Sequence, residues 1–246
     1  MPKQSGLGQR FFVGGYDLSG DTGSASRIGG GPAPSEITGI DKFAYERVGL
    51  LRTGSIEWSS WFNPDAAHAH PVLSALPYTD VATTWATGTT QGDPAYSQVS
   101  KQVDYAPTRA ADASMTIAVV GLSNGYGGEW GAQLTAGLRT DTTATSPATG
   151  LDMLASTSLG GQAYLQVAAF TGTSATIAIQ DSANNSAFTA VTGFAFTTVT
   201  TAPTSQRLQL GATATLRRYV RVVTTGTFSN LVFHVNIVKN QTTTSF

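Results

Sequence analysis

Residues beyond 150 alternate apolar and polar side chains with a period of two, and this pattern constrains the fold more than any other feature of the sequence. Alternate residues are apolar in QAYLQVAAF (162–170), SATIAIQDS (174–182) and NLVFHVNIV (230–238). Successive side chains of a strand point to opposite faces, so such alternation is typical of strands that bury one face. Turn signals separate these segments at intervals of about 12 residues, which predicts a β-sandwich, of jelly-roll or immunoglobulin-like type, over 151–246.

The first half of the chain shows weaker strand patterns and a single helix signal. Pro71 has a fixed φ that suits a first helical turn, so we predict one short helix that ends at Leu76. Residues 19–34 (SGDTGSASRIGGGPAP) and 140–150 (TDTTATSPATG) are rich in Gly, Ser, Thr and Pro, which predicts a long loop and a linker. Further strands are predicted at 43–50, 54–62, 80–88, 96–105, 113–121, 187–199, 205–211 and 217–223, and 129–138 is ambiguous between strand and helix. The chain is thus predicted to be all-β with one helix.

Charge supports a division into two modules, which we place at 1–145 and 146–246. Residues 1–150 hold 13 acidic and 9 basic side chains, a net of −4, and residues 151–246 hold 2 and 5, a net of +3. Only 12% of all residues are charged. A monomer usually needs more charge to stay soluble, so this composition favours a subunit that buries much of its surface in an assembly.

Composition also excludes several classes of function. The chain has no cysteine, which rules out disulfides, thiolate catalysis and Cys-ligated metals. The segment MPKQSGLGQRFF lacks an apolar core, and no run of about 18 apolar residues occurs anywhere. We therefore expect no signal peptide and no membrane anchor, and we expect synthesis and folding in a cytoplasm.

Two short motifs point weakly to catalysis or metal binding. Residues 121–125 (GLSNG) match the GxSxG pattern, but a nucleophile elbow needs a helix directly after it, and Tyr126-Gly127-Gly128 form helices poorly. A hairpin turn is the favoured interpretation, and an esterase remains a minor alternative that rests on Ser123. His68 and His70 are too few to make a metal site, even with Asp65. We therefore expect no enzyme activity, no cofactor and no metal.

Three further clusters have ordinary structural interpretations. Residues 29–31 (GGG) lack the Lys and Ser/Thr of a phosphate-binding loop and indicate flexible backbone or close subunit approach. The tryptophans could stack on sugars, but Trp58 and Trp61 fall on opposite strand faces, and core or interface packing is favoured. The arginines at 217, 218 and 221 indicate a salt-bridged surface or a subunit contact more than nucleic-acid binding.

Long phrases of the sequence resemble the major tail proteins, or tail tube proteins, of long-tailed phages that infect actinobacteria. The resemblance covers almost the whole chain. The phrases are GYDLSGDTGS (15–24), ITGIDKFAYERVGLLRTGSIEWSSWFNP (37–64), HPVLSALP (70–77), SNGYGGEWGAQLTAGLRTDT (123–142), IQDSANNSAFTAVTGFAF (179–196) and LRRYVRVVTTGTFSNLVFHVNIVKN (216–240).

This resemblance implies a structural protein of the virion. Tail tube proteins form stacked rings, typically of six copies, in which a β-sandwich with a flanking helix contributes strands to a continuous barrel. DNA passes through the commonly acidic lumen during ejection without specific binding. The partners implied are further copies of the chain and the tape measure, tail terminator and distal tail proteins. The implied location is the tail tube of the virion, after synthesis in the bacterial host cytoplasm.

Applied to this chain, the resemblance makes 19–34 the expected contact between rings and 43–62 the expected edge that closes a ring. The 146–246 module is then expected on the tube exterior. Two alternatives remain open: a virion decoration or head–tail connector protein, and a carbohydrate- or receptor-binding β-sandwich. The residues expected at subunit interfaces are Tyr16, Asp17, Arg27, Tyr45, Arg47, Arg52, Glu57 and Trp61.

Overall fold

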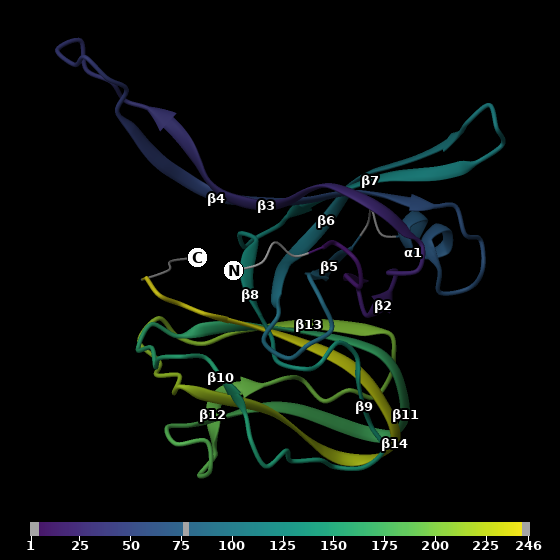
Figure 1. Cartoon of the computed structure of the whole chain (residues 1–246), viewed down its shortest axis with the longest axis vertical. Coiled ribbons are helices and arrows are strands. Elements are labelled where there is room, and N and C mark those ends of the chain that lie inside the picture. The colour runs from purple at the N-terminus through teal and green to yellow at the C-terminus, as the bar shows by residue number, and fades with distance from the viewer. Residues whose placement is uncertain (1–4, 76–78, 243–246) are drawn as a thin grey trace.

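The computed structural model describes residues 5–75 and 79–242 and is almost entirely β, which confirms the predicted fold class. Its one helix in these ranges is α1 (Ala69–Ala75), where the short flanking helix was predicted. Leu76, with which that prediction ended, lies outside the described residues. All strand pairs are antiparallel and belong to one connected 14-stranded sheet system (Figure 1).

Seven strands make up the N-terminal module, in the spatial order β3-β4-β7-β6-β5-β1-β2. Alternate residues of β4 and β7, among them Ile56, Trp58 and Val119, are buried against Phe11 of β1 and Leu73 of α1. The helix and the end of the sheet that holds β1 and β2 thereby cover the face of β4 and β7 on which these residues lie. The strands are β1 (Arg10–Val13), β2 (Tyr16–Asp17), β3 (Thr22–Glu36), β4 (Arg47–Trp61), β5 (Asp80–Ala86), β6 (Pro94–Arg109) and β7 (Met115–Ser123).

Residues 19–34 are mostly strand, so the prediction of a loop was wrong. β3 pairs with β4 along its length, from Thr22↔Ser60 to Glu36↔Arg47, with register shifts that absorb irregular residues. The composition of this Gly- and Ser-rich segment does not favour a strand. It forms one because β4 supplies its backbone hydrogen-bond partners. Glycine is needed here for packing, because a Cβ on Gly30 would lie 2.1 Å from the carbonyl oxygen of Thr53.

The C-terminal module is a β-sandwich built around two very long strands. β11 and β14 pair from Gly161↔Lys239 to Ser182↔Tyr219 and turn together from one layer of the sandwich into the other (Figure 1). The strands of this half are β8 (Glu129–Gln133), β9 (Arg139–Asp141), β10 (Leu151–Asp152), β11 (Gly161–Ser182), β12 (Thr189–Ala195), β13 (Thr204–Gln209) and β14 (Tyr219–Lys239).

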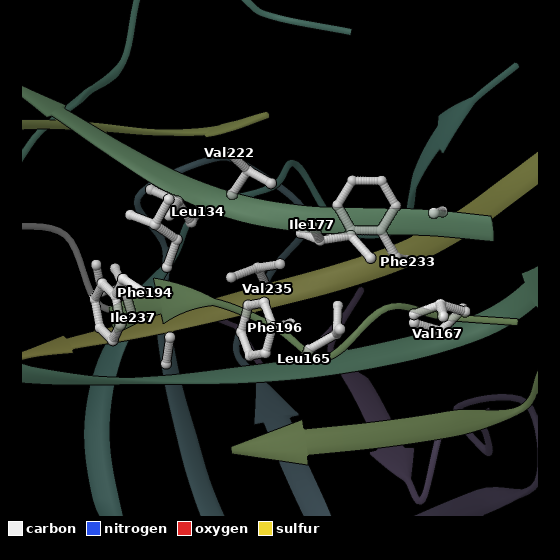
Figure 2. Packing of buried hydrophobic residues seen from close by; sticks show 14 of the residues in the cluster. Leu134, Leu165, Val167, Ile177, Phe194, Phe196, Val222, Phe233, Val235 and Ile237 are labelled. Atoms are coloured by element: carbon white, nitrogen blue, oxygen red, sulfur yellow. The ribbon is translucent and has the colours of Figure 1, made fainter. Parts of the chain in front are cut away.

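Apolar residues on one face of β11 and β14 meet in the core of this sandwich. Figure 2 shows Leu165 and Ile177 of β11 beside Phe233 and Val235 of β14, with Phe196 packed against them. The period-two pattern therefore identified the core face of both strands correctly.

The segments 162–170 and 174–182 were predicted as two strands but form one, and so do 217–223 and 230–238. The intervening Gly residues suggested turns. Instead they allow bends: β11 shifts register on both sides of Gly172, where a Cβ would lie 2.5 Å from Phe228 Cα. Bulges of this kind increase local twist without ending a strand.

The two modules share one sheet and a polar interface. β8 pairs with β6 of the first module and with β14 of the second. Where the face of β11 and β14 opposite the core meets the first module, it is polar and buried: Gln166 accepts a bond from Gly15 N and donates to the carbonyl oxygen of Ala82, and Asn236 donates to Ser97 Oγ.

Residues 140–150 are held against β14 rather than left as a free linker, since β9 pairs with it and Thr145 bridges to Thr224. The module boundary at 145 stays a prediction.

Candidate assembly surface

A free hairpin of residues 30–54, which we call the arm, is the most exposed part of the molecule, and residues 38–46 form its tip. β7 pairs with β4 only from Ser55 to Trp61, so residues 30–37 and 47–54 pair only with each other. Figure 1 shows this arm reaching far beyond the body of the protein. An isolated two-stranded ribbon is marginally stable in water, so an arm of this length is suited to gaining contacts elsewhere.

Large apolar side chains gather at the arm and its tip without a core to bury them. Ile40 and Phe43 are fully exposed, and Leu51 is 87% exposed. The other exposed apolar residues of the arm are Ile37, Tyr45, Val48 and Leu50. Contiguous exposed apolar groups of this kind mark sites of interaction in proteins that remain soluble.

The N-terminal sheet also leaves one face open, which we call the open face. Cross-strand register places Arg27, Glu57, Val120 and Asp104 in one row across β3, β4, β7 and β6. These side chains point away from the buried face, because their strand neighbours Ile56 and Trp58 are buried. In Figure 1 the C-terminal module lies on the other side of this sheet. Small residues fill the next row, which holds Ser59, Ala118 and Ala106.

The structure brings six of the eight predicted interface residues onto the β3–β4 hairpin. Arg27 and Glu57 are paired on the open face, and Arg47 stacks on Tyr45 near the tip, 5.1 Å from the ring centre. Trp61 is half exposed at the end of β4.

Arg52, on the arm, reaches back to Glu129 of β8. Tyr16 and Asp17 lie apart from the others, on β2 at the opposite edge of the sheet. Asp17 there pairs with Arg10 at 3.0 Å.

The prediction that residues 43–62 form a ring-closing edge was wrong for residues 55–61. β4 is paired on both sides between Ser55 and Trp61, so it is an interior strand there. Beside this interior stretch the free edge is that of β3, whereas in the arm residues 47–54 of β4 also have one unpaired side. The apolar tip was also missed as a set of interface residues, although the segment ITGIDKF (37–43) places three large apolar side chains between two hairpin strands.

The GxSxG segment does not form a nucleophile elbow. Ser123 ends β7, and residues 124–128 lead into β8 with no helix between. The predicted hairpin turn was also wrong, because β7 and β8 both pair with β6 and lie end to end along it.

The two neighbouring histidines are engaged separately. His68 Nδ1 lies 2.8 Å from Asp21, and His70 Nδ1 lies 2.5 Å from the hydroxyl of Tyr105. In residues 5–75 and 79–242 no group of three His, Asp or Glu side chains is arranged to hold a metal ion. The same ranges contain no helix with the length and apolar character to cross a membrane.

The remaining clusters follow their structural interpretations. Trp58 is buried and Trp61 exposed, as their opposite strand faces predicted. Arg217 pairs with Asp181 at 2.6 Å and Arg218 with Asp152 at 2.7 Å, which confirms the salt-bridged surface for these two arginines. Arg221 instead donates hydrogen bonds to Gln180 and to the carbonyl oxygen of Pro147.

Sequence comparisons find no matching protein-family model and no matching curated protein. Among solved structures, the chain is similar to the SPP1 Dit (gp 19.1) protein, described as a paradigm of the hub adsorption apparatus in phages that infect Gram-positive bacteria. The identity is 11%, the TM-score is 0.35, and the match covers 94% of this chain and 99% of that one.

It is also similar to a chain of the phage p2 baseplate in its activated conformation with Ca, at 8% identity and a TM-score of 0.37 over 95% of this chain and 99% of that chain. Because these TM-scores are low, we carry nothing over from these proteins to this chain.

Proposed function

We propose that this chain is a structural subunit of a phage tail tube, which polymerises as stacked hexameric rings around a channel for DNA. The observation that carries the proposal is the arm, which projects from the body with a fully exposed apolar tip. The resemblance of the sequence to major tail proteins supports the same assignment. In this proposal the chain assembles into a tube through which DNA passes, and it catalyses no reaction.

The arm supplies the contact between rings. Its apolar tip residues, Ile40 and Phe43, lose their exposure only if another surface covers them. Burying such side chains contributes about 1.5–3 kcal/mol each, which repeated around a ring gives a stable stack. The neighbour that covers the tip is a second copy of this chain.

The open edge of β3 supplies the contact within a ring. An unpaired edge strand is a template for pairing with another chain, and a closed ring satisfies it without uncontrolled growth. The open face then lines the channel, and the C-terminal module, on the other side of the sheet, lies on the exterior with its net charge of +3.

The charges of the open face bear on the expectation of an acidic lumen. Glu57, Asp80 and Asp104 share this face with Arg27 and Lys101, since Lys101 pairs with Leu122 in the adjoining row and forms an ion pair with Asp80 at 2.7 Å. These rows carry one more acidic than basic side chain, so most of the acidic excess of residues 1–150 lies elsewhere. A face of largely compensated charge and small side chains offers a polyanion few strong contacts.

Electron microscopy of the purified full chain tests the proposal. We expect rings or tubes from the wild type and monomers from Ile40→Ser/Phe43→Ser, because the exposed tip contributes to contacts but not to the monomer core. Lys42→Ser, in the same tip, is the matched control and should assemble.

Unchanged melting temperatures would show that the tip variant is folded. Tubes formed equally well by the tip variant would contradict the proposed inter-ring contact. Saturable binding of host glycans by a chain that forms no rings would favour the receptor-binding alternative instead.

A further inference from the structure

The arm joins the body through a narrow neck of glycines. Gly30 of β3 pairs with Gly54 of β4 at this point. A Cβ on Gly54 would lie 2.5 Å from the hydroxyl of Tyr96 and 2.8 Å from the backbone nitrogen of Gly128. Backbone therefore packs directly on its neighbours at the neck, and few side chains there can fix the angle at which the arm leaves the body.

One charged side chain crosses from the arm back to the body just beyond this neck. Arg52, two residues from Gly54, places Nη1 3.6 Å from Oε1 of Glu129 on β8. Its side chain lies flat over Gly127, where a Cβ would come within 3.0 Å of Arg52 Cβ. The arm is thus tied to the body by an ion pair two residues from the neck, where the two arm strands begin to pair only with each other.

Glu129 is held rigidly on its other side by the C-terminal module. Its side chain is only 3% exposed, and Tyr164 of β11 donates a hydrogen bond to Oε2 at 2.8 Å. Arg207 of β13 donates to the Tyr164 hydroxyl at 3.2 Å and lies 3.8 Å from the ring centre of Tyr126. Oε2 is therefore engaged within the body, while Oε1 faces the arm.

We propose that Arg52 and Glu129 form a latch that sets the direction of the arm before assembly, and that both are positioning residues for polymerisation. The role in polymerisation rests on the proposed function, whereas the latch itself is a property of the single chain. An arm held in its docking direction has less conformational freedom to lose when it meets a neighbour, so binding is favoured.

Spin labels can report the direction of the arm in the unassembled full chain. Because the chain has no cysteine, Ala44→Cys at the tip and Ser158→Cys on the body give one unambiguous pair of labelled sites. The distribution of distances between the two labels should show one main peak in the wild-type background. Arg52→Met and Glu129→Gln should each raise the population outside this peak roughly two- to fivefold, as expected for the loss of a partly exposed ion pair.

Arg47→Met is the matched control, since Arg47 lies on the same strand and contacts Tyr45 of the arm rather than the body. It should leave the distribution unchanged. The proposal is overturned if Arg52→Met and Glu129→Gln both keep the wild-type distribution, or if Arg47→Met broadens it equally. If Glu129→Gln lowers the melting temperature, the test rests on Arg52→Met alone. Arg52 is a surface side chain, so its replacement should leave the fold intact.

Acidification supplies a second readout. Burial raises the pKa of Glu129, opposed by the Tyr164 hydrogen bond and the charges of Arg207 and Arg52. The other charged or titratable groups that face it are Arg52, Arg207 and the tyrosines at 96, 126 and 164. Arginine and tyrosine side chains do not ordinarily titrate in the acidic range. Lowering the pH should therefore broaden the wild-type distribution and leave that of Glu129→Gln unchanged; an equal response in both would overturn the proposal.

Assembly kinetics separate this inference from the proposed function. If the wild type forms no tubes, the tube assignment fails, while the label distances still decide the latch. If the wild type forms tubes and Arg52→Met nucleates them at the same rate, the positioning role is overturned.

Discussion

Two buried polar residues, His234 and Asp21, join segments of the chain that are far apart in the sequence. His234 of β14 is fully buried, stacks on Phe12 of β1 and donates from Nδ1 to the carbonyl oxygen of Gly137 at 3.1 Å. Asp21 accepts bonds from Asn63, His68 and the backbone of Ala69, and so anchors the start of α1.

The two residues respond to acid in different pH ranges. Burial, the largest influence, raises the pKa of Asp21, but the hydrogen bonds from Asn63, Ala69 and His68 outweigh it and hold the pKa below the usual range. Its contribution to stability is therefore present above the ordinary Asp pKa and lost as pH falls through the lower folded value. Burial lowers the pKa of His234 to about 4.

We predict that acidification from pH 6.5 to pH 4 destabilises the protein through His234. The unfolded chain binds a proton to this residue near pH 6.5, whereas the folded chain does so only near pH 4, so the free energy of unfolding falls as pH drops, by up to about 3 kcal/mol. Urea titrations at several pH values measure this. His234→Gln, which keeps a donor for Gly137, should show a shallower slope in this window, and an equal slope would contradict the prediction.

At the scale of elements, the decisive features are the bends in the long strands. Gly226 of β14 has a φ of 119°, and a Cβ there would lie 2.3 Å from the carbonyl oxygen of Ser174. The bend it permits carries β14 from one layer of the sandwich to the other. Period-two alternation predicted the faces of these strands, because burial leaves that pattern in the sequence. It could not predict their continuity, because Gly serves equally in a turn and in a bulge.

We predict that Gly226→Ala costs about 1–3 kcal/mol of stability, since the new Cβ must enter both a strained backbone region and occupied space. Gly211→Ala is the control, because a Cβ at that position meets nothing within 4 Å. Chemical denaturation measures both variants. Equal stability of Gly226→Ala and the wild type would show that the bend does not depend on glycine.

The arm shows the same limit of sequence reasoning at the candidate site. Residue types alone marked 19–34 as irregular, but its hydrogen-bond partners lie on β4, more than 20 residues away in places. Arg27 and Glu57 share a row because β3 and β4 pair there, which no local pattern in the sequence shows. Their place at a subunit interface stays a prediction. Arg52 is one of the predicted interface residues, but its partner Glu129 is distant in sequence and no local pattern links the two.

For the whole molecule, the shared sheet and the polar layer make the two modules one body. Gln166 and Asn236 of the second module bond to groups of the first, and each such bond contributes about 0.5–1.5 kcal/mol net to holding the modules together. The charge division at residue 150 therefore does not coincide with a mechanical division of the fold.

We predict that the full chain unfolds in a single cooperative transition. The calorimetric and van't Hoff enthalpies should agree, as they do for a single unit. Gln166→Leu removes hydrogen bonds across the module interface, so it should lower the transition temperature without splitting the peak. Two resolved peaks in the wild type would contradict this expectation and support independent modules.

The pairing of β11 with β14 gives the molecule a direction of mechanical strength. Their hydrogen bonds run across the strands and continue from Gly161↔Lys239 to Ser182↔Tyr219. A pull along these strands stretches all of those bonds at once, whereas a pull at right angles opens them one pair at a time. The C-terminal module should thus resist a force along its strands far better than a force that separates them one hydrogen bond at a time. It would therefore stay folded when an assembly held by the arm is stretched along these strands.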